Sequence, residues 1–208
     1  MKEPVATVYI VDDDAGVRTS LRILLKSVGI AATPLPSAQE FLSSYSYSQP
    51  GCLLLDIRMP GMNGLQLQSE LNVRGANIPV IFITGHGDVP MAVEAMQHGA
   101  FDFLQKPFRD QQVIDCVQKA LERDRENREW LKGHDRIRAG LASLTPRERE
   151  VLSLLTSGKA NKVIAGKLGL SPRTVEIHRA HVMEKMAASS IAQLVRMVME
   201  VEPRPPAP

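Results

Sequence analysis

The chain has 208 residues, of which 44% are hydrophobic, and it carries a formal net charge of +2. This length exceeds that of most single domains, so we expect two domains, each with a core built mainly from aliphatic side chains. Only two cysteines occur, Cys52 and Cys116, and both lie in apolar patterns, which argues against a disulfide framework and a cysteine metal site. No apolar run approaches a membrane span and no signal-peptide pattern is present, so we expect a cytoplasmic protein without a membrane partner.

The charge is unevenly distributed along the chain. Residues 1–121 contain 9 basic and 12 acidic side chains, whereas residues 144–208 contain 10 basic and 6 acidic ones. This asymmetry favours a different partner for each half of the protein. The basic excess of the second half is modest, and by itself it does not establish binding to nucleic acid.

Residues 6–121 alternate between short apolar runs and segments with helical periodicity. The pattern predicts strands over residues 6–11, 30–35, 51–56, 78–84 and 100–104, with helices over 15–28, from 37, over 63–73 and 88–98, and from 110. The run 51–56 is apolar on both faces, which is typical of a strand in a parallel sheet covered by helices. Five βα units predict a flavodoxin-like α/β fold, a doubly wound sheet between two layers of helices.

Polar residues stand where four of the predicted strands end. Asp12 and Asp13 follow the first strand, Asp56 ends the third, Thr84 ends the fourth and Lys106 follows the fifth. The carboxyl ends of parallel strands share one edge of the sheet, so we expect these residues to meet. Three carboxylates suit Mg²⁺, and an ammonium and a hydroxyl can hold an anion, which together predict phosphoryl transfer onto Asp56.

Other interpretations fit parts of this pattern. A lone aspartate at the end of a strand more often caps the next turn than acts as a nucleophile, and the acidic strand ends could lie on loops that never meet. A phosphatase of the haloacid dehalogenase kind needs D-x-D-x-[TV] on its first strand, but Gly16 stands where Thr or Val is required. Such a phosphatase would also leave Asp56 without a role.

Four motifs closely resemble the receiver domain of bacterial two-component response regulators. They are Val11–Asp14, Leu55–Gly64, Ile83–Val93 and Phe103–Phe108, and the third resembles the FixJ subgroup in particular. The resemblance implies that Asp56 is the phosphoacceptor and that Asp13 and Asp56 bind Mg²⁺ directly. It also implies that Asp12 acts through metal-bound water and that the main-chain carbonyl of Arg58 completes the protein's ligand set.

The same resemblance implies the switching residues. Thr84 and Lys106 would bind the phosphoryl group, Phe103 would be the aromatic residue whose rotamer follows Thr84, and Lys106-Pro107 would be a cis peptide bond. The FixJ subgroup further suggests a dimer face on the helix 89–98 and the strand 100–104; its expected residues are Val89, Val93 and Met96. We expect no enzymatic activity beyond the receiver's own phosphorylation and dephosphorylation.

Residues 122–142 have the composition of a linker. Glu122–Arg138 holds eleven charged residues in seventeen, with opposite signs interleaved. The pattern predicts one long helix from Asp110 to about Lys132, solvated beyond Leu121, followed by a looser link. A connector that carries signals between the domains, and that self-associates, is as consistent with this pattern as a solvated spacer.

Residues 144–201 predict a small all-α domain of four helices. Thr145-Pro146-Arg147-Glu148 combines an N-cap, a proline at the first helical position and the closing glutamate of a capping box. Further helices are expected over 161–168, from 172 to about 186, and over 191–201. A turn at Gly169 joins the second helix to the third, which is the helix-turn-helix pattern, although similar helix pairs occur in proteins that never bind DNA.

The third helix of this domain has two different faces. At 100° per residue, Val175, Val182 and Met186 form its buried stripe. The opposite face and its flanks offer side chains for base edges and phosphates. The predicted DNA-binding residues are Lys162, Arg173, Thr174, Glu176, Ile177, Arg179, Ala180 and His181. Glu184 shares this face and is more simply explained as a solvated residue.

Residues 143–201 resemble the LuxR/NarL-type DNA-binding domain, through Leu144–Leu152, Asn161–Ala165 and Ser171–Arg179. In that family the fourth helix can dimerise, and closing the small core explains it equally well. The predicted organisation is a receiver domain over 1–121, a helical linker over 122–142, a helix-turn-helix domain over 143–202 and a disordered tail over 203–208.

These patterns predict a response regulator of the FixJ/NarL type. A sensor histidine kinase would phosphorylate Asp56, and the protein would then dimerise, bind double-stranded promoter DNA and regulate transcription, with RNA polymerase as a further partner. The alternative is a DNA-binding transcription factor whose receiver serves only as a phosphorylation-independent dimerisation module. The complete set of Asp13, Asp56, Thr84 and Lys106 argues against that alternative.

Overall fold

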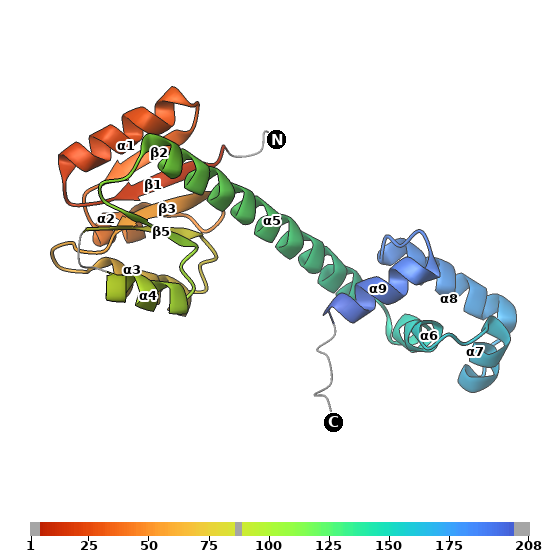
Figure 1. The fold of residues 1–208 in the computed structure, drawn as a ribbon. Helices are drawn as coiled ribbons and strands as arrows, with labels where there is room; N and C mark the ends of the chain where they lie inside the picture. Colours follow the sequence, from red (N-terminus) through yellow and green to blue (C-terminus); the bar gives the residue numbers. More distant parts are fainter. Residues whose placement is uncertain (1–4, 86–88, 202–208) are drawn as a thin grey trace. The chain divides into compact units, whose positions relative to one another are not determined.

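The computed structural model describes residues 5–85 and 89–201, except for the side chains of Val89, Pro90 and Ala92. It divides into two compact units, residues 1–128 and 129–208 (Figure 1). The division falls on the helix α5 (Asp110–Ser143), which contributes to both units. Within the described ranges, no helix is long and apolar enough to cross a membrane. Asp88, the first residue of the predicted helix 88–98, and the predicted tail 203–208 lie outside the described residues.

Over its described residues, the first unit contains one sheet of five parallel strands in the order β2-β1-β3-β4-β5. The strands are β1 (Thr7–Val11), β2 (Ala31–Leu35), β3 (Gly51–Asp56), β4 (Val80–Thr84) and β5 (Asp102–Gln105). Each begins and ends within two residues of its prediction. The strand order changes direction between β1 and β3, which is the place where ligands bind in open α/β sheets. The predicted flavodoxin-like fold is confirmed.

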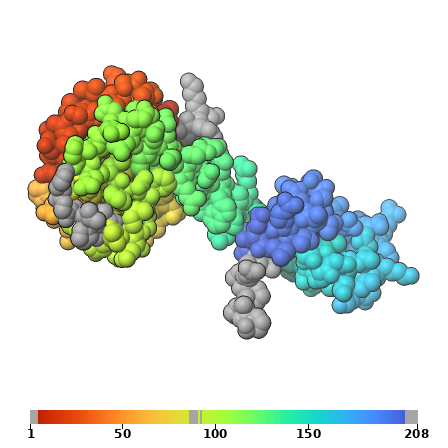
Figure 2. Space-filling model, viewed as in Figure 1, coloured from red at the N-terminus to blue at the C-terminus, as the bar shows by residue number. Residues whose placement is uncertain are grey.

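Helices cover both faces of this sheet, because alternate residues of each strand point to opposite sides. Cys52 and Leu54 of β3 pack with α1 (Ala15–Ser27) and the start of α5. Leu53 and Leu55 pack on the other side, with α2 (Ala38–Ser44), α3 (Gly64–Val73) and α4 (Val89–Gln97). The six residues of β3 are all buried, as the continuous apolar run predicted. In Figure 2 the yellow-green segment with α4 and β5 forms part of the visible surface of this unit.

The prediction that α5 ends near Lys132 is wrong, because the helix continues to Ser143. Gly133 lies inside this helix, where a glycine costs about 1 kcal/mol relative to alanine. Packing of the C-terminal end of α5 outweighs that cost. Ile137 is buried in a core of the second unit. Gly140 lies so close to the backbone of Lys185 that an added Cβ would stand 3.1 Å from its carbonyl oxygen.

The described part of the second unit contains four further helices and the end of α5. They are α6 (Pro146–Thr156), α7 (Asn161–Leu168), α8 (Pro172–Lys185) and α9 (Ile191–Val201). The predicted capping box between Thr145 and Glu148 is present. Gly169 ends α7 in the left-handed conformation, with φ of 66°, which explains the glycine at this tight turn. The predicted helix-turn-helix pair is therefore α7 and α8.

Candidate functional site

The carboxyl edge of the sheet brings the predicted polar residues together. Asp12 directly follows β1 and Asp56 ends β3, and the register of these strands pairs Val11 with Leu55, so the two aspartates are neighbours. Thr84 ends β4 and pairs with Gln105, the residue before Lys106. The alternative in which the acidic strand ends lie on separate loops is therefore excluded for Asp12 and Asp56.

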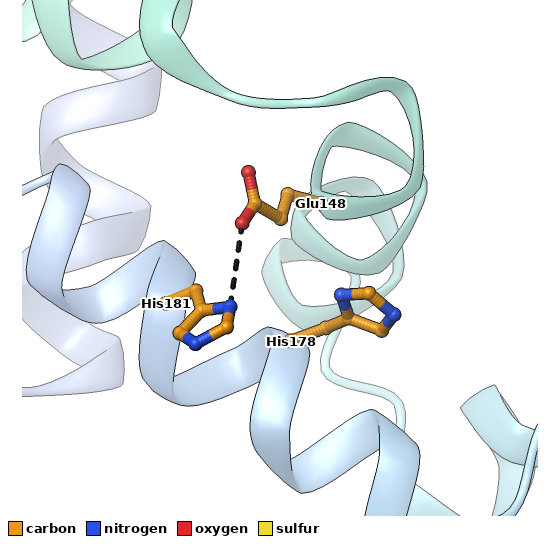
Figure 3. Close-up of side chains that lie close together, drawn as sticks. All are labelled: Glu148, His178 and His181. Atoms are coloured by element: carbon orange, nitrogen blue, oxygen red, sulfur yellow. Dashed lines mark ion pairs between the residues drawn. The ribbon is translucent and has the colours of Figure 1, made fainter.

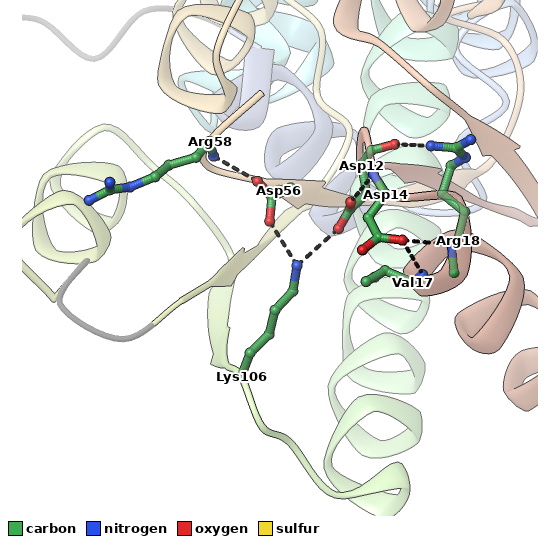
Figure 4. Close-up of polar contacts among 8 residues, drawn as sticks. Asp12, Asp14, Val17, Arg18, Asp56, Arg58 and Lys106 are labelled. Carbon is green, nitrogen blue, oxygen red and sulfur yellow. Dashed lines mark hydrogen bonds and ion pairs between the residues drawn. The ribbon is translucent and has the colours of Figure 1, made fainter. Parts of the chain in front are cut away.

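The side chain of Lys106 bridges two buried carboxylates (Figure 4). Its Nζ lies 3.1 Å from Oδ2 of Asp12 and 3.0 Å from Oδ1 of Asp56. Asp12 is 1% exposed and Asp56 is 8% exposed. Two buried negative charges thus share one ammonium group, which leaves a net negative charge at a site with a low local dielectric.

Backbone groups fix the orientation of both carboxylates. Oδ1 of Asp12 accepts the N–H of Asp14 at 2.8 Å, and Oδ2 of Asp56 accepts the N–H of Arg58 at 2.7 Å. The Arg18 guanidinium donates to the carbonyl oxygen of Asp12. Asp14 caps α1 by accepting the N–H groups of Gly16 and Val17. Of the three consecutive aspartates, Asp12 therefore faces the site, whereas Asp14 is the N-cap of α1.

Asp13 is exposed at the same edge, and within the described part of the chain it has no hydrogen bond or ion pair. Its carboxylate is therefore available to a ligand from solvent, but among the described residues the oxygens of Asp12, Asp13 and Asp56 do not all lie within 4.8 Å of one another. A glycine allows α3 to begin close to the site: a Cβ on Gly64 would stand 2.5 Å from the carbonyl oxygen of Asp56. A larger residue at this position would displace either the helix or the strand end that carries Asp56.

The electrostatics of the site depend on burial and on the shared ammonium. Burial raises the pKa of Asp56, and hydrogen bonding with Lys106 opposes that rise without cancelling it. Burial lowers the pKa of Lys106, but its hydrogen bonds to Asp56 and Asp12 raise it above the ordinary value overall. Lys106 is therefore a cation at neutral pH, whereas burial shifts Asp56 toward its neutral form and the ammonium of Lys106 opposes that shift.

The donor set fits a hard divalent cation. Carboxylate oxygens of Asp12, Asp13 and Asp56 lie on adjacent strand ends, and oxygen ligands are those that Mg²⁺ prefers. The uncompensated charge of the buried pair supplies the electrostatic reason for such an ion. The residues present at this edge are thus compatible with the predicted Mg²⁺.

The two predicted switch residues occupy different environments. Thr84 is 3% exposed, and its carbonyl oxygen accepts the N–H of Lys106 at 2.7 Å. Phe103 is 42% exposed on β5, two residues before the end of the strand. The buried side chain of Thr84 on β4 and the exposed ring of Phe103 on β5 therefore lie on adjacent strands. The peptide bond between Lys106 and Pro107 is cis, as predicted.

The predicted dimer face is partly described. Val93 is 53% exposed and Met96 is 40% exposed on α4, and Phe103 on β5 is exposed as well. The side chain of Val89 lies outside the described part of the structure. These apolar side chains leave an uncovered surface on α4 and β5 of the first unit.

The third predicted region lies on α7 and α8 of the second unit. Val175, Val182 and Met186 are buried, as predicted, so the opposite side of α8 faces outward. Most of the predicted DNA-binding residues are exposed; they are Lys162, Arg173, Glu176, Ile177, Ala180 and His181. Thr174 and Arg179 are half-buried and already engaged, Thr174 with the N-cap Ser171 at 2.8 Å and Arg179 with Asn161 at 3.3 Å.

Sequence reasoning missed Asp124 and Arg128 on α5. The helix was predicted to be solvated beyond Leu121, yet Asp124 is 3% exposed and bonded to Arg128. Their spacing of four residues with opposite charge is a visible signal, but a surface ion pair has the same spacing. Whether such an ion pair is buried or lies on the surface depends on contacts with segments that are distant in the sequence.

The comparisons with known proteins agree with both regions. Residues 8–118 match the family described as response regulator receiver domain, and residues 142–198 match the bacterial regulatory proteins of the luxR family. The transcriptional regulatory protein FixJ of Azorhizobium caulinodans is 50% identical over 92% of this chain and 91% of its own length. The response regulator protein TodT of Pseudomonas putida is 41% identical over 95% of this chain and 87% of its own.

Solved structures show the same relationship. The response regulator StyR is 43% identical, with a TM-score of 0.88 over 94% of this chain and 99% of that one. Full-length FixJ from B. japonicum is 41% identical, with a TM-score of 0.59 over 95% of this chain and 98% of that one.

Proposed function

This chain belongs to the two-component response regulators that join a receiver domain to a LuxR-type DNA-binding domain, and we propose that Asp56 is its phosphoacceptor. The donor is a phosphohistidine on a sensor histidine kinase. The phosphorus–nitrogen bond of that donor breaks as a phosphorus–oxygen bond to Asp56 forms. The reaction modifies only the side chain of Asp56, and the new phosphorus–oxygen bond is later hydrolysed.

The bridge from Lys106 to both Asp12 and Asp56 is the observation that carries this proposal. An ammonium 3.0 Å from the acceptor oxygen stabilises the ionised form of Asp56, and it is placed to meet the oxygens of an incoming phosphoryl group. The N–H of Arg58 holds the other oxygen of Asp56 and so fixes which lone pairs face the donor. The adjacent hydroxyl-bearing residue, Thr84, is the second group proposed to bind the phosphoryl oxygens.

We propose Mg²⁺ as the metal of this site. Asp13 and Asp56 bind it directly, Asp12 through water, and the main-chain carbonyl of Arg58 completes the protein's share. When bound, Mg²⁺ neutralises carboxylate charge and polarises the phosphoryl oxygens. The exposed carboxylate of Asp13 and the net negative charge of the buried pair support this assignment.

Phosphorylation is proposed to act through Thr84 and Phe103. A phosphoryl group on Asp56 attracts the Thr84 side chain, and the exposed ring of Phe103 turns inward as that side chain moves. The surface of α4 and β5, with Val93 and Met96, then becomes the face of a homodimer. Reversing a 1:99 population needs about 5.5 kcal/mol, which phosphate contacts and burial of one aromatic ring can supply together.

The dimer is proposed to place two DNA-binding domains on adjacent half-sites of a promoter. The exposed side of α8 reads bases, and Lys162 at the start of α7 contacts phosphate. Two linked domains bind more tightly than one because the second binds at a high effective concentration. RNA polymerase is the proposed downstream partner.

Labelling with a small phosphodonor and Mg²⁺ tests the proposed acceptor. The wild type should be labelled, and Asp56→Asn and Asp13→Ala should not. Asp14→Asn is the matched control, because it also removes a carboxylate from this edge while asparagine caps α1 equally well. Equal labelling of Asp56→Asn and the wild type would show that the acceptor lies elsewhere.

A further inference from the structure

The second unit holds a separate group of metal-ligating side chains, Glu148, His178 and His181 (Figure 3). Glu148 lies on α6, and the two histidines lie three residues apart on α8, so they share one side of that helix. One ligand atom from each residue lies within 4.8 Å of the other two. Neither the acidic edge of the sheet nor the proposed phosphorylation uses these residues, and of the three only His181 is also a predicted DNA-binding residue.

Glu148 is buried, and its two oxygens have different partners. Oε2 accepts the N–H of Thr145 at 2.8 Å and the Nζ of Lys185 at 2.7 Å. Oε1 lies 3.6 Å from Nδ1 of His181. The ammonium of Lys185 and the N–H of Thr145 both favour the ionised carboxylate. Oε1 is thus a charged oxygen directed toward the histidines.

His178 supplies an independent observation. Its Nδ1 is buried and has no hydrogen-bond partner among the described residues. A buried polar atom has lost its hydrogen bonds to water, and in native structures such atoms generally have a replacement. In Figure 3 the imidazole of His178 lies next to Glu148 and beside His181. A metal ion shared with these two residues would provide the missing partner.

We propose that Glu148, His178 and His181 form a binding site for a divalent transition-metal ion of the Zn²⁺ class. Two imidazole nitrogens and one carboxylate oxygen are the ligands that Zn²⁺ accepts, whereas Mg²⁺ takes oxygen ligands. Three protein ligands leave a fourth position for water or another group. The ion would link α6 to α8, the helix whose outward side is proposed to contact DNA.

Two features of the site set its affinity. Zinc bonds of about 2.0–2.1 Å in a tetrahedron place ligand atoms about 3.3 Å apart, so the imidazoles must turn inward from their present spacing. The His181 side chain is 52% exposed and is free to do so without disturbing the core. Lys185 remains on the other oxygen of Glu148, and its charge weakens binding of a cation relative to a carboxylate without such a partner.

Zinc titration of the full chain by calorimetry tests this proposal. Excess Mg²⁺ throughout occupies the oxygen ligands of the first unit. The variant carries His178→Gln and His181→Gln, and the matched control carries His98→Gln and His134→Gln, which remove the same number of histidines elsewhere. Co²⁺ in place of Zn²⁺ adds an electronic spectrum that reports nitrogen ligation and low coordination number. Circular dichroism checks that each variant is folded.

The wild type and the control should bind one equivalent of Zn²⁺ and give the Co²⁺ spectrum. The His178/His181 variant should bind at least about tenfold more weakly and lose that spectrum. If the double variant does not fold, the single variant His181→Gln, which changes an exposed residue, is compared with the wild type and the control instead. Absence of binding by the wild type, or equal binding by the variant and the control, would overturn the proposal.

Discussion

Asp124 on α5 accepts the main-chain N–H of Gly51, the first residue of β3, at 2.9 Å. The same oxygen accepts Nε of Arg128 at 2.8 Å, and Arg128 donates in turn to the carbonyl oxygens of Tyr47, Ser48 and Gln49. A stretch of α5 that the sequence assigns to the linker is therefore anchored to the loop that leads into the central strand. This contact makes α5 as far as Arg128 part of the first unit.

Asp124→Ala should destabilise the first unit by about 1–3 kcal/mol, because it leaves the buried N–H of Gly51 and the Nε of Arg128 without their acceptor. Hydrogen exchange should show earlier exchange of the Gly51 amide, and thermal unfolding should begin at a lower temperature. Asp135→Ala removes an exposed carboxylate from the same helix and serves as the control. Unchanged protection at Gly51 would mean that the contact contributes no stability.

The second unit should lose stability as the pH falls from 4.5 toward 2. The pKa of Glu148 is lowered from its ordinary value of 4.5 to about 2, first by its hydrogen bond with Lys185. A carboxyl group with a lowered pKa contributes stability above its ordinary pKa and loses it as protonation proceeds in the folded state. Thermal unfolding at a series of pH values, in a metal chelator, measures this loss.

Glu148→Gln is the informative variant for that measurement. Glutamine can still close the capping box on Thr145, but it has no charge to pair with Lys185. The variant should be less stable than the wild type at pH 7, and the difference should shrink toward pH 2. A difference that stays constant over this range would show that the ionised form of Glu148 is not what stabilises the unit.

Val93→Asp should prevent phosphorylation-dependent dimerisation without preventing phosphorylation of Asp56. Burying an unpaired carboxylate in the proposed interface costs more than about 1.4 kcal/mol, so the dimer should weaken by more than tenfold. Val73→Asp places the same charge on another exposed helical valine of this unit and is the control. Sedimentation of the phosphorylated proteins decides the question, since a dimer as tight as that of the wild type contradicts the proposed face.

Lys162→Ala and Glu176→Gln should affect DNA binding in different ways. Loss of one phosphate contact weakens binding to all sequences about equally and reduces the salt slope by roughly one. Loss of a base contact changes preference at one position, by about 1–3 kcal/mol. Lys167→Ala, on another side of α7, is the control for charge. Binding to a panel of single-base variants at several salt concentrations separates these effects, and uniform weakening by both variants would mean that α8 is docked differently.

The local elements of this protein follow from its sequence alone. The continuous apolar run in β3, the period of α8 and the capping box at Thr145 are patterns of neighbouring residues, and such patterns predict elements without knowledge of the fold. The meeting of Asp12, Asp56 and Lys106 was also predictable. In a parallel sheet, residues at the carboxyl ends of strands share one edge, whatever their separation along the chain.

Tertiary structure decided what local patterns leave open. The charge of α5 predicts a solvated helix, but its contacts with Gly51 and the preceding loop bury Asp124, and packing around Ile137 and Gly140 extends the helix past Gly133. The approach of Glu148 to two histidines of α8 likewise depends on how α6 and α8 pack. Helical periodicity specifies which face of an element is apolar, whereas the partner of a polar side chain depends on segments distant in sequence that only the folded chain brings near.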